Sequence, residues 1–156
     1  MTINVLFVCL GNICRSPAAE AIFLRKLSDK KILDQYIVDS AGTGGWHVGR
    51  KADSRMQQAA SLRGVSIKSK ARQMNLDDFN SFDLILTMDN SNFADVISLS
   101  EELNGPFRAQ IKPLLEYSTN NSLLEVPDPY YGGEKGFDQG LHLLDDAIDG
   151  LINDLN

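Results

Sequence analysis

The stretch that most strongly constrains the fold runs from Ile3 to Ser16 and reads INVLFVCLGNICRS. Its first part, Ile3 to Val8, is rich in β-branched and aromatic residues, which predicts a buried β-strand. Gly11 and Asn12 then interrupt the apolar run with residues that tolerate a left-handed backbone. We therefore expect the strand to end in a tight loop.

A helix is expected directly after this loop. Ser16 is a candidate N-cap, and Pro17 is favourable in the first turn of a helix. Apolar residues then recur with helical spacing at Ala19, Ile22, Phe23 and Leu27. The N-terminal unit is thus predicted to be strand, loop and helix.

The rest of the chain repeats this alternation. Further strands are predicted at Tyr36–Ala41, Asp83–Met88 and Ala109–Leu114, and further helices at Ser54–Arg63, after Asn90-Ser91 and from Phe137 to the end. Strands that alternate with helices favour a parallel sheet covered on both faces, because parallel neighbours need crossover connections. In such sheets ligands bind at the C-terminal ends of the strands. The stretch Glu116–Gly133 is interpreted as a long functional loop.

Length and composition narrow the class of protein. A chain of 156 residues is expected to form one domain, residues 1–156. The formal charge of −6 disfavours nucleic acid and anionic membranes as partners. The apolar run Val5–Leu10 is too short to span a membrane and lacks the basic leader of a secretory signal. With only two cysteines, Cys9 and Cys14, a disulfide framework is not indicated, and a reducing, cytoplasmic location is expected.

The loop from Cys9 to Ser16 carries the signature of an anion site. Backbone N–H groups at a helix N-terminus converge on one concavity, and the helix dipole adds to the attraction for an anion. Arg15 offers a planar fork that matches two oxygens of a phosphate. The same field favours an ionised thiol, so Cys9 is expected to be a thiolate nucleophile, assisted by a hydrogen bond from the Ser16 hydroxyl.

A second segment supplies a candidate proton donor. Displacing the alcohol from a phosphate monoester requires a carboxylic acid near the leaving oxygen. Asp128 lies in the stretch VPDPYYGG, where prolines restrict the backbone and Tyr130 and Tyr131 could form walls of a pocket for a phenyl ring. Trp46, in the loop after the second predicted strand, is a candidate for another wall.

These two segments and the elements between them resemble the low-molecular-weight protein tyrosine phosphatases over essentially the whole chain. The resemblance implies a three-layer α/β sandwich around a central four-stranded parallel sheet, the phosphotyrosine protein phosphatase I-like fold. It implies that Cys9 is the nucleophile, that Arg15 binds phosphate, and that Asp128 is the general acid and base of phosphotyrosine hydrolysis through a phosphocysteine. The residues expected to bind phosphate or support the loop are Leu10, Gly11, Asn12, Ile13, Cys14, Ser16 and Ser40.

The resemblance carries further expectations. Cys14 matches a neighbour that can form a protective disulfide with the nucleophile. The pocket is expected to be lined by Ile13, Trp46, Tyr130 and Tyr131, without a metal or other cofactor. Partners are expected to be phosphotyrosine proteins or peptides, with inorganic phosphate as product, and the chain is expected to be a monomer or to self-associate weakly.

Two positions bear on specificity. Many members carry a histidine where this chain has Ser69, so a supporting hydrogen bond is expected to differ. Related protein-arginine phosphatases place threonine where Ile13 stands, so the apolar residue favours phosphotyrosine.

Other interpretations remain open on the sequence alone. A cysteine after a buried strand is usually an inert core residue, and an aspartate beside proline is ordinary turn chemistry. Tyr130 and Tyr131 could simply pack the loop, His142 is interpreted as structural, and His47 as a residue of the pocket rim. Thiol-coupled arsenate reduction would need more cysteines than the chain has. A module that binds phosphotyrosine without hydrolysis would not need both a nucleophile and an acid.

Overall fold

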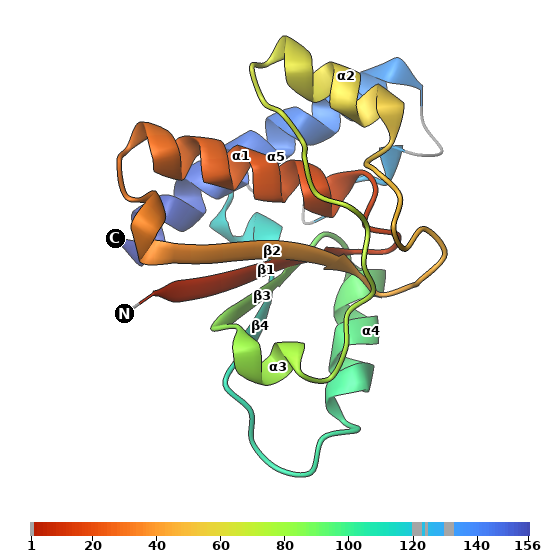
Figure 1. Cartoon of the computed structure of the whole chain (residues 1–156), viewed down its shortest axis with the longest axis vertical. Helices are drawn as coiled ribbons and strands as arrows, with labels where there is room; N and C mark the ends of the chain where they lie inside the picture. The colour runs from red at the N-terminus through yellow and green to blue at the C-terminus, as the bar shows by residue number, and fades with distance from the viewer. Residues whose placement is uncertain (1, 120–122, 124, 130–132) are drawn as a thin grey trace.

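A parallel four-stranded sheet forms the centre of the molecule (Figure 1). The computed structural model describes residues 2–119, 123, 125–129 and 133–156. The strands are β1 (Ile3–Cys9), β2 (Tyr36–Gly42), β3 (Leu84–Thr87) and β4 (Gln110–Pro113), and their order in the sheet is β2-β1-β3-β4. The expected four-stranded parallel sheet is therefore confirmed.

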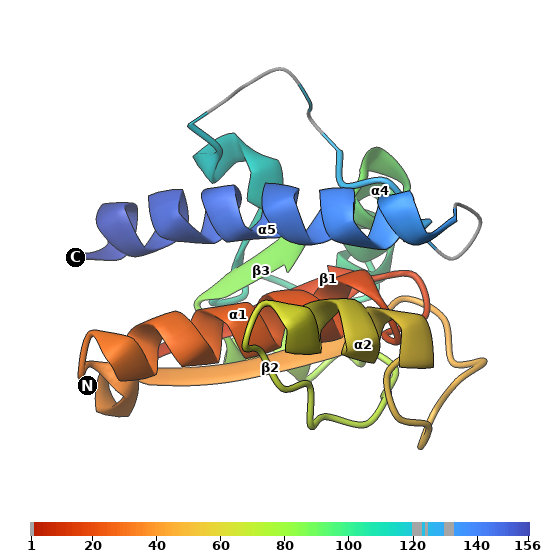
Figure 2. The same ribbon diagram turned by 90° about the horizontal axis from the view of Figure 1, so that it is seen from above.

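Helices cover both faces of this sheet. They are α1 (Arg15–Asp29), α2 (Ser54–Leu62), α3 (Asp78–Ser81), α4 (Asn90–Ser100) and α5 (Glu134–Leu155), with short 3-10 turns η1 (Leu33–Gln35) and η2 (Leu114–Tyr117). Figure 1 shows α1, α2 and α5 on one face and α3 and α4 on the other, and Figure 2 shows α1 and α5 running side by side. The three-layer α/β fold predicted from the sequence is confirmed.

The side chains of β1 divide the core into two clusters. Val5, Phe7 and Cys9 point to the face covered by α1 and α5, while Leu6 and Val8 point to the face covered by α3 and α4. This division follows from the two-residue period of a strand. Because both faces of β1 are buried, the sequence shows a continuous apolar run there rather than an alternating one.

Several element boundaries differ from those predicted. Helix α1 begins at Arg15 with Cys14 as its N-cap, so the prediction that Ser16 caps this helix was wrong. The Ser16 hydroxyl instead lies 2.9 Å from the Cys9 sulfur. Helix α5 begins at Glu134, three residues before the predicted start at Phe137.

Three short elements, α3, η1 and η2, were not predicted, because segments of three or four residues carry no measurable periodicity. No helix among the described residues is long and apolar enough to cross a membrane.

Candidate active site

The loop between β1 and α1 lies at the C-terminal edge of the sheet. Asn12 adopts a left-handed backbone with a φ of 58°, which turns the chain back toward the start of α1. Arg15 and Ser16, the first two residues of α1, are buried along with the rest of that turn. The loop is thus built between the end of a central strand and a helix N-terminus, as predicted for an anion site.

The sulfur of Cys9 is held by groups from this same loop. It lies 2.9 Å from the hydroxyl oxygen of Ser16 and accepts a hydrogen bond of 3.3 Å from the backbone N–H of Asn12. Only 3% of Cys9 is exposed. The Asn12 N–H thus donates to the sulfur, and the Ser16 hydroxyl lies within hydrogen-bonding distance of it, so polar groups of the loop contact the thiol.

Asn12 is the hub of a network that extends away from the cysteine. Its side-chain amide donates to the hydroxyl oxygens of Ser16 at 2.7 Å and Ser40 at 3.0 Å, and its carbonyl oxygen accepts from the backbone N–H of Arg72 at 3.0 Å. Ser40 in turn donates to the carboxylate of Glu20 at 2.6 Å. Segments distant in sequence therefore converge to hold one loop residue.

Glu20 is the end of this network. Burial raises the pKa of its carboxyl, and hydrogen bonds from Ser40 and Ser69 partly offset that effect. Ser69, where the resemblance leads us to expect a histidine, thus contacts the network through Glu20.

Arg15 is buried and tied to two carboxylates. Its guanidinium donates to Asp89 at 2.6 Å and to the backbone oxygen of Val126 at 3.0 Å, and it lies 3.6 Å from the carboxylate of Asp128. Burial by itself would lower the pKa of Arg15, but the charges of Cys9, Asp89 and Asp128 outweigh it and raise that pKa. A permanently charged guanidinium therefore lies beside the cysteine.

Asp89 is a site residue that the sequence reasoning missed. One of its carboxylate oxygens binds Arg15, and the other accepts from the backbone N–H of Asn92 and so caps α4. The available signal was an acidic residue immediately after the third predicted strand, at the edge of the sheet where ligands bind. Its partner, Arg15, is 74 residues away in the sequence, so the pairing itself carried no local signal.

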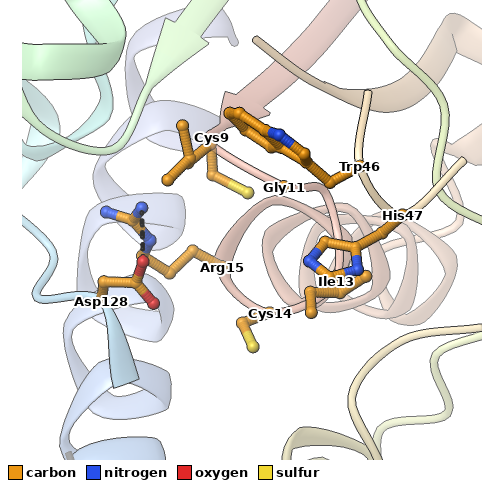
Figure 3. Close-up of a pocket in the computed structure, with 9 residues that line it drawn as sticks. Cys9, Gly11, Ile13, Cys14, Arg15, Trp46, His47 and Asp128 are labelled. Atoms are coloured by element: carbon orange, nitrogen blue, oxygen red, sulfur yellow. Dashed lines mark ion pairs between the residues drawn. The ribbon is translucent and has the colours of Figure 1, made fainter. Parts of the chain in front are cut away.

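These groups surround a cavity of about 430 Å³ (Figure 3). The residues that line it are Cys9, Leu10, Gly11, Ile13, Cys14, Arg15, Trp46, His47 and Asp128. Figure 3 shows Arg15 beside Asp128 on one side of the cysteine and Trp46 on another side. The structure thus brings together the predicted nucleophile, the predicted phosphate ligand and the predicted acid.

Trp46 and His47 form part of the cavity rim. The indole of Trp46 lies against Gly44, where a Cβ atom would clash with the ring, and 70% of the residue remains exposed. The imidazole of His47 packs over Gly11, where an added Cβ would lie 2.9 Å from the ring. Glycines at these positions therefore let the rim approach the loop. Tyr130 and Tyr131, the other predicted wall residues, lie outside the described residues.

Cys14 differs from Cys9 in its surroundings. Burial, followed by the charges of Asp53, Cys9 and Asp128, raises the pKa of its thiol to about 12. Cys14 therefore remains a thiol at neutral pH. Both cysteines are free in the structure.

The arrangement has the parts needed for phosphoryl transfer. A cysteine sulfur, a fixed guanidinium and a carboxyl group line one cavity, where N–H groups at a helix N-terminus add positive potential. Among the described residues, no cluster of three or more histidine, cysteine or acidic side chains has the geometry of a metal site.

Comparisons with known proteins agree with this chemistry. The family model of the low molecular weight phosphotyrosine protein phosphatases matches residues 4–156. The human low molecular weight phosphotyrosine protein phosphatase is 42% identical over 137 residues, covering 88% of this chain and 85% of that protein.

Two solved structures are similar over nearly the whole chain. A protein tyrosine phosphatase from Entamoeba histolytica, with Hepes in the active site, is 41% identical with a TM-score of 0.89, covering 99% of this chain and 97% of that one. A Drosophila arginine phosphatase is 31% identical with a TM-score of 0.93, covering 97% of each chain.

Proposed function

Because the chain belongs to the low molecular weight phosphotyrosine protein phosphatases, a family of phosphoric monoester hydrolases, we propose that it hydrolyses phosphotyrosine through a phosphocysteine intermediate. In this proposal Cys9 is the nucleophile, Arg15 holds the phosphoryl oxygens, and Asp128 is the general acid and base. Substrates are phosphotyrosine side chains of proteins or peptides, and inorganic phosphate is the product.

The first half-reaction transfers the phosphoryl group to sulfur. The Cys9 thiolate attacks phosphorus, an S–P bond forms, and the bond between phosphorus and the tyrosyl oxygen breaks. Asp128, protonated at the start, gives its proton to the departing oxygen. Arg15 and the N–H groups of the loop stabilise the charge that spreads over the three outer oxygens.

The second half-reaction returns the enzyme to its initial state. Asp128, now ionised, removes a proton from a water molecule that attacks phosphorus, and the S–P bond breaks. Inorganic phosphate leaves, Cys9 is again a thiolate, and Asp128 is again protonated. The two proton transfers balance over one cycle.

The observation that carries the proposal is the setting of the Cys9 sulfur. It lies 2.9 Å from the Ser16 hydroxyl and 3.3 Å from the Asn12 amide, at a cavity that Arg15 and Asp128 also line. An inert core cysteine would not need two polar partners or a buried arginine beside it.

Substitution of the nucleophile is the direct test. The purified protein should hydrolyse p-nitrophenyl phosphate in the presence of EDTA, and Cys9→Ser should lower kcat by at least about 10⁴-fold because the serine hydroxyl is not ionised. Cys14→Ser is the matched control, since it changes the other cysteine of the loop, and it should keep most of the activity. Full activity in Cys9→Ser would overturn the mechanism.

Protein-arginine phosphatase activity is the second candidate, favoured by the similarity to the Drosophila arginine phosphatase. Ile13, which lines the cavity, argues for phosphotyrosine, because an apolar side chain packs against a phenyl ring better than against a guanidinium. Turnover of peptides that differ only in phosphotyrosine, phosphoserine or phosphoarginine decides between them. A higher kcat/KM for the phosphoarginine peptide would replace the first proposal.

Three further expectations stay predictions. We propose that oxidation links Cys9 to Cys14, that the protein acts in the reducing cytoplasm, and that it acts as a monomer or a weak dimer. The raised pKa of Cys14 predicts that this disulfide forms slowly at neutral pH, because a protonated thiol attacks an oxidised partner slowly. Mass spectrometry of the peroxide-treated protein would reveal the bridge as a loss of two hydrogen atoms.

A further inference from the structure

Charge is distributed unevenly along this chain. Residues 1–72 hold twelve of the fifteen basic residues and five of the 21 acidic ones, whereas residues 73–156 hold the other three basic and sixteen acidic residues. The overall charge of −6 therefore conceals a cationic half and an anionic half. The active-site cavity is built from both halves, since Arg15 and His47 come from the first and Asp128 from the second.

Three basic residues lie close to the segment that carries Trp46 and His47, and we call Arg50, Lys51 and Lys70 the cationic ledge. Lys51 and Lys70 face each other across an isolated antiparallel bridge. Two backbone hydrogen bonds hold this pairing, from Gly49 to Ala71 and from Ala71 to Arg50, both at 2.8 Å. Facing positions in an antiparallel pair place their side chains about 5 Å apart, so the two ammonium groups repel each other.

No carboxylate of the described residues neutralises the ledge. All three side chains are exposed, and none forms an ion pair with a described residue. Asp53, the nearest acidic residue in the sequence, is occupied by Arg55, whose guanidinium lies 2.9 Å from the Asp53 carboxylate. The ledge is therefore a patch of exposed positive charge on the surface.

Short backbone links join the ledge to the active site. The N–H of Arg50 donates to the carbonyl oxygen of His47 at 2.9 Å, and His47 lines the cavity. The N–H of Asp53, two residues after Lys51, donates to the Ile13 carbonyl oxygen at 2.8 Å.

Lys70 is linked in the same way. It is two residues from Arg72, whose N–H donates to the side chain of Asn12 at 3.0 Å. Each lysine is thus two residues from a backbone N–H that is hydrogen-bonded to the phosphate loop.

The other side of the mouth carries the opposite charge. A second cavity of about 380 Å³ shares Leu10 and Trp46 with the first, so the exposed indole lies between the two. Asp95 and Glu102, from α4 and the turn after it, line this second cavity. The mouth is therefore polarised, with the cationic ledge on one side and carboxylates beyond Trp46.

We infer that the ledge recognises acidic side chains on one side of the phosphotyrosine in a protein or peptide substrate. The inference rests on the proposed function and adds a substrate preference to it. An extended peptide advances about 3.3 Å per residue, so two or three residues on one side of the phosphotyrosine extend over about 7 to 10 Å of the surface around the mouth. Acidic residues on the other side would face Asp95 and Glu102 and be repelled.

A peptide fits this surface better than an anionic membrane does. A membrane presents a wide sheet of negative charge and would meet the field of the whole molecule, which is net negative. A peptide anchored in the cavity meets only the groups around the mouth. Debye screening over about 8 Å at physiological salt restricts its interactions to those groups.

The test compares three phosphotyrosine peptides. The first has two glutamates before the phosphotyrosine and two glutamines after it, and the second has the reverse arrangement. The third has glutamine at all four of these positions. Wild-type protein should show a kcat/KM about tenfold higher for one acidic peptide than for the neutral peptide, and no gain for the other acidic peptide. Raising salt from about 0.05 to about 0.5 M should remove most of this preference.

Two double variants test whether the preference for the acidic peptide depends on Lys51 and Lys70. Lys51→Gln with Lys70→Gln should reduce the ratio of acidic to neutral peptide by about three- to tenfold. Lys30→Gln with Lys31→Gln is the matched control, because it removes the same charge beyond the C-terminal end of α1, about 22 Å from the phosphate loop, and should preserve the ratio.

Each outcome bears on a definite claim. Equal turnover of all three peptides by wild-type protein, or equal loss of preference in both double variants, would overturn the inference that the ledge recognises acidic side chains. Phosphotyrosine hydrolysis would stand in either case. Failure to hydrolyse any of the peptides would instead overturn the proposed function. Binding to vesicles of phosphatidylserine and phosphatidylcholine that depends on Lys51 and Lys70, without a peptide preference, would assign the ledge to a membrane and overturn the inference.

Discussion

The phosphate loop, residues 9–16, and the acid segment, residues 125–129, meet at one cavity but are held very differently. The loop is fixed from several directions, since the Asn12 side chain alone bonds to Ser16, Ser40 and the backbone of Arg72. The acid segment is anchored by the N–H of Val126 on the Met88 carbonyl oxygen at 2.8 Å and by the exposed carboxylate of Glu125, which accepts from the backbone N–H and the side-chain amide of Asn90, both at 3.2 Å. It is further joined to Arg15 through the Val126 carbonyl oxygen and the carboxylate of Asp128.

The difference follows the demands of the chemistry. In the proposed reaction, the nucleophile and the groups that bind phosphate must hold their geometry throughout, so several contacts fix their positions. Asp128, the proposed acid and base, must transfer a proton twice, and one of its contacts is with Arg15, which bound phosphate would also engage. Substitutions should therefore affect binding geometry in the loop and leaving-group chemistry in the acid segment.

Among substitutions that keep the nucleophile, loss of the shared arginine should have the largest effect. Arg15→Lys keeps the charge but cannot bridge two phosphate oxygens and still reach Asp89, so kcat/KM should fall by about 10³-fold or more. The measurement is steady-state turnover of p-nitrophenyl phosphate. Asp89→Asn, which retains the arginine but removes its charged partner, should cost much less. Near-normal activity in Arg15→Lys would show that the loop alone binds the phosphoryl group.

Removing the acid should give a loss that depends on the leaving group. Asp128→Asn should lower kcat/KM for phenyl phosphate by about 10² to 10³-fold and for p-nitrophenyl phosphate by less than about tenfold, because nitrophenolate leaves without a proton. A plot of log kcat/KM against leaving-group pKa checks this and should steepen in the variant, since kcat/KM reports only the first half-reaction. Equal loss of kcat/KM for both substrates would exclude Asp128 as the acid.

Two variants of Asn12 can separate the effect of its side-chain hydrogen bonds from the effect of its left-handed backbone. Asn12→Gly keeps access to the φ of 58° but removes three hydrogen bonds, and activity should fall by about ten- to a hundredfold. Asn12→Ala loses the same bonds and adds backbone strain, so its free energy of unfolding should be lower than that of Asn12→Gly by about 1 kcal/mol. Urea unfolding measures the difference, and equal stabilities would show that the backbone there is unstrained.

The two cysteines offer the mildest test of the loop. At about pH 8, iodoacetamide should modify Cys9 and leave Cys14 unmodified, because burial raises the pKa of Cys14 to about 12 from an ordinary value of 9.0. Peptide mass spectrometry locates the label, and urea-unfolded protein, where both cysteines should react, is the control. Faster labelling of Cys14 would contradict the assigned environments.

The same pKa shift predicts a pH dependence of stability. The native state binds the Cys14 proton more tightly than the unfolded state, so this contribution is present below about pH 9 and is lost as pH rises from there toward about 12. Cys14→Ala should therefore show a weaker decline in the free energy of unfolding over this range. An identical decline in both proteins would show that other groups cause it.

Much of the fold and half of the site could be predicted because their signals are local. The apolar run of β1, the turn at Gly11 and Asn12 and the helix that follows are neighbours in the sequence, so steric preferences and periodicity reveal them directly. Cys9 and Arg15 were predicted for the same reason. The contact of Ser16 with the Cys9 sulfur was predicted and is present at 2.9 Å, whereas the prediction that Ser16 caps α1 was wrong, because the helix already begins at Arg15.

What the sequence determined by itself is a strand that delivers a cysteine to a helix N-terminus with an arginine six residues later, because these relations lie within one short segment. Tertiary structure decided which carboxylates meet that arginine, how Ser40, Glu20 and the backbone of Arg72 hold Asn12, and how two lysines come to face each other beside the cavity. Those contacts join residues far apart in the chain. They exist only once the order of the strands brings the ends of the connecting segments to the same edge of the sheet.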